Sequence, residues 1–170
     1  MYQPATAEPP VGREPRYSEG YIPHGGHATL TSAFAVAVAT ATIINRAAGR
    51  EVPERVAVGD VITVGIATHK LSRLISKSRV ATFIRAPFVR LEGSRGHGEL
   101  SEHPRGTGLR QTTGELLVCP HCLGQWIAAS FAAGLVAAPR LTRLAAATWT
   151  AEAIADALHL GYVAAEDRVA

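Results

Sequence analysis

Uncharged apolar stretches alternate with polar, arginine-rich segments along the chain. Residues 28–44 and 123–138 contain no charged side chain, and their lengths are at the short end of what a helix needs to cross a bilayer. Two weaker apolar stretches, 56–75 and about 144–165, contain ionisable residues. The pattern predicts three to four short helices. We expect an all-α fold, a small polytopic membrane helical bundle, with a soluble alanine-rich bundle as the alternative.

The segments between these helices differ in composition. Residues 76–91 mix apolar and basic side chains, which predicts an amphipathic helix at the membrane interface, ended or kinked by Pro87. Glycine and arginine dominate residues 92–113, which predicts a long loop. Proline is frequent in residues 1–26, and we expect a flexible tail there without a cleavable signal peptide. The helical membrane domain then covers 27–166, and 167–170 form a C-terminal tail.

Arginine supplies most of the positive charge. The net charge is +3, with 47% hydrophobic and 18% charged residues, so an apolar chain carries its cations in a few segments. The termini and the segment between the second and third helices hold twelve of the 17 basic residues, and the other two connectors hold five. The bias of basic residues toward cytoplasmic loops predicts that both termini and the long loop face the cytoplasm. The candidate contacts for anionic lipid headgroups are Lys77, Arg79, Arg85 and Arg90.

The two cysteines lie two residues apart, immediately before the third apolar stretch. A cytoplasmic position favours free thiols or metal binding over a stable disulfide. Zinc in a structural site takes four ligands, and the cysteines supply two. The candidate metal ligands are Cys119, Cys122, His121 and His103, with His97 as a further donor. Thiol exchange is a second interpretation. In a third, both thiols pack the start of the helix and Pro120 sets its first turn.

Ionisable residues also share one face of the fourth helix. Glu152, Asp156 and His159 follow the i, i+4 and i+7 spacing that places side chains on one side of a helix. Such groups at bilayer depth are costly and usually paired, so they form a candidate intramembrane polar face, with Asp60 as a neighbour. Lys70 and Arg73 are the candidate counter-ions. The alternative is that the fourth helix lies at the interface and this face meets water.

Residues 99–126 carry a family resemblance. The segment ends in Cys-Pro-His-Cys-Leu-Gly-Gln-Trp and contains Pro-Arg-Gly and Gly-Glu-Leu steps upstream of it. Together with Ala-Thr-His-Lys-Leu-Ser-Arg-Leu at 67–74, it resembles the bacterial family called domain of unknown function 1360. The chain differs at Lys70, where the family usually has arginine. The resemblance implies a small bacterial integral membrane protein and no established activity.

These observations favour a non-enzymatic scaffold or docking component of the bacterial inner membrane. We expect it to contact membrane lipid and a protein partner or a second copy of itself. Nucleic acid is disfavoured because stacked bases need exposed aromatic side chains in a groove, whereas the apolar residues of 76–91 share one helical face. The alternative is a small membrane thiol redox or metal-handling protein that uses Cys119 and Cys122, with zinc as the metal.

Overall fold

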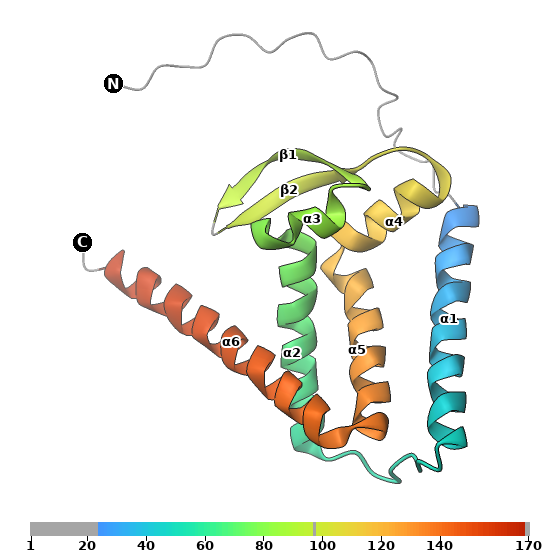
Figure 1. Ribbon diagram of the computed structural model, residues 1–170. Coiled ribbons are helices and arrows are strands. Elements are labelled where there is room, and N and C mark those ends of the chain that lie inside the picture. The colour runs from blue at the N-terminus through green and yellow to red at the C-terminus, as the bar shows by residue number, and fades with distance from the viewer. Residues whose placement is uncertain (1–23, 97, 169–170) are drawn as a thin grey trace, which may run out of the picture.

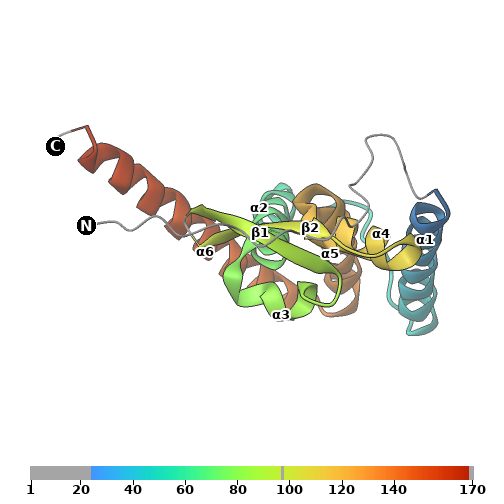
Figure 2. The same ribbon diagram turned by 90° about the horizontal axis from the view of Figure 1, so that it is seen from above.

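The computed structural model describes residues 24–96 and 98–168, and this part of the chain is mostly helical. Helix α1 (His24–Ala47), helix α2 (Val58–Lys77) and helix α5 (Pro120–Ala137) stand side by side (Figure 1). Helix α6 (Pro139–Glu166) crosses α2 obliquely, and its C-terminal part extends away from the other helices (Figures 1 and 2). The chain runs down α1, up α2, down α5 and up α6 in the view of Figure 1.

The segment between α2 and α5 folds into a compact layer at one end of the upright helices, which we call the cap (residues 78–118). It contains a short 3-10 helix (Arg79–Ala81), helix α3 (Thr82–Arg85), strand β1 (Val89–Gly96), strand β2 (Glu99–Pro104) and helix α4 (Gly108–Val118). The two strands form an antiparallel hairpin with Val89 opposite Pro104 and Gly96 opposite Glu99. Seen from above, this hairpin lies over the ends of the helices (Figure 2).

An abrupt bend joins the cap to the third upright helix. The axes of α4 and α5 differ by 81°, and the helix cannot continue through this point because Pro120 lacks the N–H that an unbroken helix would need. Pro120 instead occupies the first turn of α5, where its missing N–H costs nothing. Helix α4 therefore lies across the end of the bundle while α5 runs along it.

The buried core is small. One cluster joins α2, α5 and α6 through two alanines, two branched aliphatic side chains and one aromatic ring: Ala67, Ala146, Leu123, Ile127 and Phe131. A second group, Ala81, Val89 and Leu100, lies inside the cap. Many larger apolar side chains instead face outward, among them Ile43 (65% exposed), Val61 (58%) and Leu158 (70%). By length and composition, α1 could span a membrane, and the bent pair α4–α5 passes the same test.

The structure corrects two sequence predictions about the cap. The chain is mostly helical, as predicted, but residues 92–113, predicted to be a long loop, form most of a two-stranded hairpin and the first half of α4. The two strands are only eight and six residues long and have glycines at their bulges. The alternation of apolar and polar side chains along them is therefore weak, which explains the error. Residues 76–91 do not form one amphipathic helix either; they are divided among α2, the 3-10 helix, α3 and β1.

The four predicted helices are present with shifted ends. The stretches predicted at 28–44, 56–75, 123–138 and 144–165 correspond to α1, α2, α5 and α6. Helix α6 begins earlier than predicted because Pro139 occupies its first turn, a position that proline favours. The predicted tail at 1–26 overlaps α1 at residues 24–26, and the rest of it lies outside the described residues.

Candidate functional site

A buried ion pair organises the cap. The side chain of Arg85, the last residue of α3, is fully buried, and its Nε donates to the carboxylate of Glu102 on β2, which is 5% exposed. The same guanidinium donates to the carbonyl of Ile75 and, at 3.0 Å, to that of Ser78. These carbonyls belong to the C-terminal end of α2, where backbone acceptors lack helical partners and the dipole favours a cation. Arg85 thus joins α2, α3 and β2.

This geometry corrects the prediction for Arg85, which cannot reach a lipid headgroup from its buried position. Of the other three residues predicted to contact headgroups, Arg79 and Arg90 are exposed and Lys77 is half-buried. Nothing in the sequence distinguished Arg85 from its neighbours, since its partner lay in a segment predicted to be a loop. Next to Arg79, the apolar side chains of Val80 and Phe83 are 80% and 75% exposed.

Polar contacts join α2 to α6 along their length. At one end, Arg143 donates through Nε and Nη2 to both oxygens of Asp60, at 2.9 and 2.8 Å for the shortest contacts. This is the bidentate geometry in which a guanidinium and a carboxylate attract each other most strongly. Further along, the hydroxyl of Thr150 donates to the carbonyl of Thr63 at 2.8 Å. The two helices therefore run in the same direction with a fixed register.

The predicted polar face is split between two places. Lys70 on α2 lies 3.5 Å from the carboxylate of Glu152 and also pairs with Asp156, so this lysine is the counter-ion of both. Its side chain is only 14% exposed, whereas each carboxylate is more than half exposed. His159 is exposed on the next turn. Asp60 does not join this group because it pairs with Arg143 near the other end of α2, and Arg73 pairs with Glu99 of the cap.

The two cysteines lie at the bend between α4 and α5. Cys119 is the N-cap residue of α5, and its sulfur accepts a hydrogen bond from the backbone N–H of Cys122 at 3.2 Å. The sulfur thereby satisfies one of the N–H groups that have no partner inside the helix. Both thiols are free, Cys119 partly exposed and Cys122 exposed. Of the interpretation in which both thiols pack the start of the helix, the structure shows Pro120 in the first turn and Cys119 partly buried at the N-cap, whereas Cys122 is exposed.

The predicted metal ligands are not brought together. Within residues 24–96 and 98–168, no group of three or more His, Cys, Asp or Glu side chains is placed to hold a metal ion. His103 lies on β2 and its Nδ1 is 3.5 Å from the carboxylate of Glu92 on β1. His121 is exposed between the cysteines. Two thiols suit zinc, but a complete tetrahedral site would need donors from elsewhere.

A further contact set attaches α1 to the cap. His27 Nε2 lies 3.2 Å from Glu115 of α4, whose other oxygen accepts from the buried side chain of Gln111 at 3.0 Å. Beside this pair, Gly26 lies so close to Thr112 that an added Cβ would be 2.0 Å from the threonine hydroxyl oxygen. Lower on α1, Phe34 meets Trp126 of α5 edge to face with ring centroids 5.2 Å apart.

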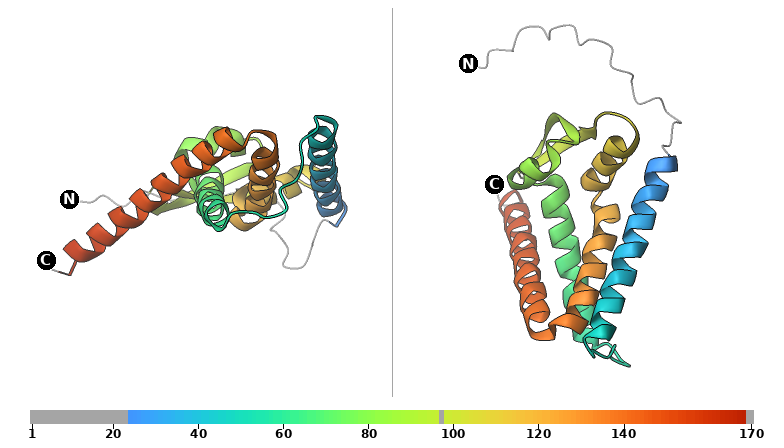
Figure 3. Two further views of the ribbon diagram at one scale, coloured as in Figure 1. Left: turned by 90° about the horizontal axis from the view of Figure 1, so that it is seen from below. Right: turned by 45° about the vertical axis from the view of Figure 1, so that its right-hand side comes forward.

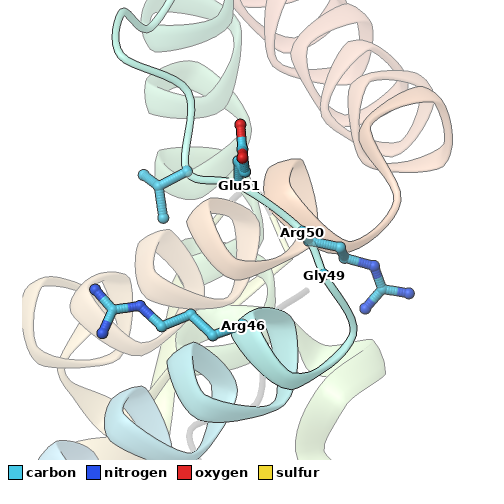
Figure 4. Close-up of a pocket in the computed structure, with 5 residues that line it drawn as sticks. Arg46, Gly49, Arg50 and Glu51 are labelled. Atoms are coloured by element: carbon cyan, nitrogen blue, oxygen red, sulfur yellow. The ribbon is translucent and has the colours of Figure 1, made fainter.

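The connector between α1 and α2 lines an open hollow of roughly 420 Å³ at the end opposite the cap. Arg46, Arg50 and Glu51 contribute to its wall, but Figure 4 shows the two arginine side chains pointing away from each other. Arg50 donates to the side chain of Asn45 at 3.2 Å instead. The hollow therefore offers no convergent set of charged groups.

Comparison with known proteins extends the sequence resemblance. No curated protein and no solved structure matches the chain. The family described as Protein of unknown function (DUF1360) matches residues 63–162, which include most of α2, the whole cap, α5 and most of α6. The ion pair of Arg85 and Glu102 and the two cysteines all lie within this range. The chain belongs to the DUF1360 family of proteins of unknown function.

Proposed function

We propose that this protein is a scaffold or docking component of the bacterial inner membrane, with α1, α2, α5 and α6 in the bilayer and the cap at its cytoplasmic face. The observation that carries the proposal is the outward-facing apolar surface. Large apolar side chains on α1, α2 and α6 are more than half exposed, among them Val36, Ile43, Val61, Ile62 and Leu158. Exposure of such an apolar surface to water is unfavourable, whereas lipid chains would cover it.

Helix lengths support the same placement. The 24, 20 and 18 residues of α1, α2 and α5 correspond to roughly 36, 30 and 27 Å at 1.5 Å per residue, close to the thickness of a bilayer core. Helix α6 has 28 residues and is inclined to the others (Figure 3). A helix that is longer than the bilayer is thick accommodates the difference by tilting.

The distribution of basic residues supports the cytoplasmic placement of the cap. The start of α1, the end of α2, the start of α5 and the last turns of α6 lie toward the cap side, and the short connectors lie at the other end (Figures 1 and 3). The cap and the chain termini hold more arginine and lysine than the two connectors. Basic residues of short loops stay preferentially in the cytoplasm.

A docking role is supported by the exposed part of α6. The helix leaves the bundle after its contacts with α2, so its C-terminal turns have no neighbouring helix in the described chain (Figure 2). Two carboxylates, Glu152 and Asp156, share the single cation of Lys70 and remain more than half exposed. Ionisable groups at bilayer depth usually face another helix, which makes this surface the candidate contact for a second membrane helix.

The alternative function, a small thiol redox or metal-handling protein, is favoured by one observation: two free thiols lie within one turn of a helix start. Purification from membranes, followed by measurement of bound zinc and titration of thiols in wild type and Cys119→Ser, separates the cases. Stoichiometric zinc lost on substitution supports metal handling. A disulfide that cycles readily with a quinone supports redox chemistry. The absence of both bound zinc and a cycling disulfide supports the scaffold.

The membrane proposal itself is tested by fractionation and labelling. After expression in a bacterial host, we expect the chain in membranes that resist carbonate extraction. In a cysteine-free background, Glu54→Cys in the connector should react with a membrane-impermeant maleimide added to intact spheroplasts. Glu92→Cys on β1 should react only after the membrane is permeabilised. A monodisperse chain in the soluble fraction without detergent would refute the membrane placement, and the reverse labelling pattern would refute the orientation.

A further inference from the structure

Two arginines of the cap converge on one backbone carbonyl. Arg105, directly after β2, donates through Nε and Nη2 to the carbonyl oxygen of Pro87, each at 3.3 Å, and through Nη2 to that of Ala86 at 2.9 Å. Arg110, in the first turn of α4, donates through Nε and Nη2 to the same Pro87 oxygen at 3.0 and 2.8 Å. The two guanidinium groups are therefore held side by side.

Within the described part of the chain, no acidic side chain pairs with either arginine. The acceptors of both guanidinium groups are neutral carbonyls, and the ion pairs found in residues 24–96 and 98–168 include neither arginine. Both residues are exposed. A guanidinium has five N–H donors, and the Nη1 groups of both arginines make none of these bonds. Two adjacent guanidinium groups thus keep N–H donors that none of these hydrogen bonds uses.

The backbone around the pair is shaped to hold this arrangement. Gly106 adopts a φ of 82°, and an added Cβ there would be 3.0 Å from Cδ of Arg110, so the absence of a side chain lets the arginine stem lie across the turn. Thr107, the N-cap of α4, makes no side-chain hydrogen bond to the helix, and the first turn has no acidic residue. The N–H groups at this helix start add positive potential beside the two arginines.

We propose that Arg105 and Arg110 form a binding site for a phosphate group, that of an anionic phospholipid headgroup or a free phosphate. Arginine forks bind phosphate oxygens in bidentate fashion, and two forks held by backbone carbonyls lose little side-chain freedom on binding. The lipid form of the site rests on the proposed membrane placement, in which the cap lies at headgroup depth beside the ends of α2 and α5. The chemistry of the pair toward phosphate does not depend on that placement.

The test uses the full-length protein in micelles of an uncharged detergent, titrated calorimetrically with dioctanoyl phosphatidylglycerol, with inorganic phosphate, and with dioctanoyl phosphatidylcholine as a zwitterionic reference. We expect one saturable site for the anionic lipid. The double variant Arg105→Gln/Arg110→Gln should bind it at least tenfold more weakly, since removal of one charge-assisted hydrogen bond weakens binding by roughly tenfold. Arg140→Gln, an exposed arginine in the first turn of α6 and outside the predicted headgroup contacts, should stay within twofold of wild type.

The arms of the titration distinguish the sources of the phosphate. If inorganic phosphate does not displace the bound anionic lipid, the site is a headgroup site. If inorganic phosphate binds more tightly than the lipid, the ligand is a free phosphate. Unchanged affinity in the double variant, or an equal loss in Arg140→Gln, overturns the proposal. If the double variant unfolds, amide exchange of residues 105–110 in wild type decides: slowing at saturating ligand supports the site, and no change overturns it. A chain that is soluble without detergent yet binds inorganic phosphate through this pair refutes only the membrane placement.

Discussion

Replacement of Arg85 by methionine tests whether the buried ion pair holds the cap on the bundle. The substitution keeps the length of the aliphatic stem but removes every donor. Glu102, which is 5% exposed, then keeps a buried carboxylate without its cation, and the carbonyls at the end of α2 lose their charged partner. Removing one member of a buried pair typically costs about 3–5 kcal/mol, because the remaining charge stays desolvated. A loss of that size is a large part of the stability of a small protein.

The measurement is thermal unfolding in detergent, followed by circular dichroism. For a chain of this size, each kcal/mol shifts Tm by roughly 2–4 °C, so Arg85→Met should lower Tm by about 6–20 °C. The double variant Arg85→Met/Glu102→Leu removes the unpaired carboxylate as well and should recover part of the loss. Its residual loss, from the carbonyls of Ile75 and Ser78, should be about 1–3 kcal/mol.

The matched control is Arg79→Met, which removes an exposed arginine from the 3-10 helix that precedes α3. Its Tm should stay close to that of wild type, because substitutions at exposed positions usually change stability by less than about 0.5 kcal/mol. If Arg85→Met also unfolds within a few degrees of wild type, or if the double variant is no more stable than the single one, the ion pair does not have the role that its burial indicates.

Three other contacts lead to testable outcomes. Gly26→Val should destabilise the protein by about 1–3 kcal/mol through overpacking against α4, whereas Gly25→Val, with nothing within 4 Å of an added Cβ, should leave Tm nearly unchanged; equal effects would refute the close approach. Lys70→Met should lower Tm, and adding Glu152→Gln should restore part of the stability, as a double-mutant cycle would show; strictly additive effects would mean that the two side chains do not interact. Cys119→Ala should destabilise the protein by about 0.5–2 kcal/mol because α5 loses its capping acceptor. Cys119→Ser, which keeps an acceptor at the same position, should unfold at a Tm close to that of wild type. Equal Tm values for the alanine and serine variants would argue against Cys119 as the N-cap of α5.

The long apolar stretches could be predicted from the sequence because their signal is local. A run of 17 uncharged residues such as 28–44 predicts a helix whatever surrounds it, and α1 covers it. The third apolar stretch was predicted at 123–138, and one of the three interpretations of the cysteines placed Pro120 in the first turn, where α5 has it. Helix ends shifted by a few residues, since prolines at first turns extend a helix beyond its apolar stretch, as Pro139 does in α6.

The cap could not be predicted in the same way because its structure depends on contacts between distant residues. Arg85 is one of several basic residues in 76–91, and only the position of Glu102 on β2 explains its burial. Gly114 looks like a loop residue, yet an added Cβ would lie 2.7 Å from the carbonyl of Phe88, so it marks the close approach of α4 to the hairpin. The pairing of Lys70 with Glu152 and Asp156 depends in the same way on the register between α2 and α6.

The alternating direction of the four long helices has a consequence for biosynthesis. In the proposed orientation, the helices enter the bilayer in two successive pairs, α1 with α2 and α5 with α6, each with its connector leading. The segments that must be translocated are then short: residues 48–57 in the first pair and the single residue Ala138 between α5 and α6 in the second. The cap is synthesised between the two pairs and never crosses the membrane, so its buried charges can assemble on the ribosomal side before the second pair inserts.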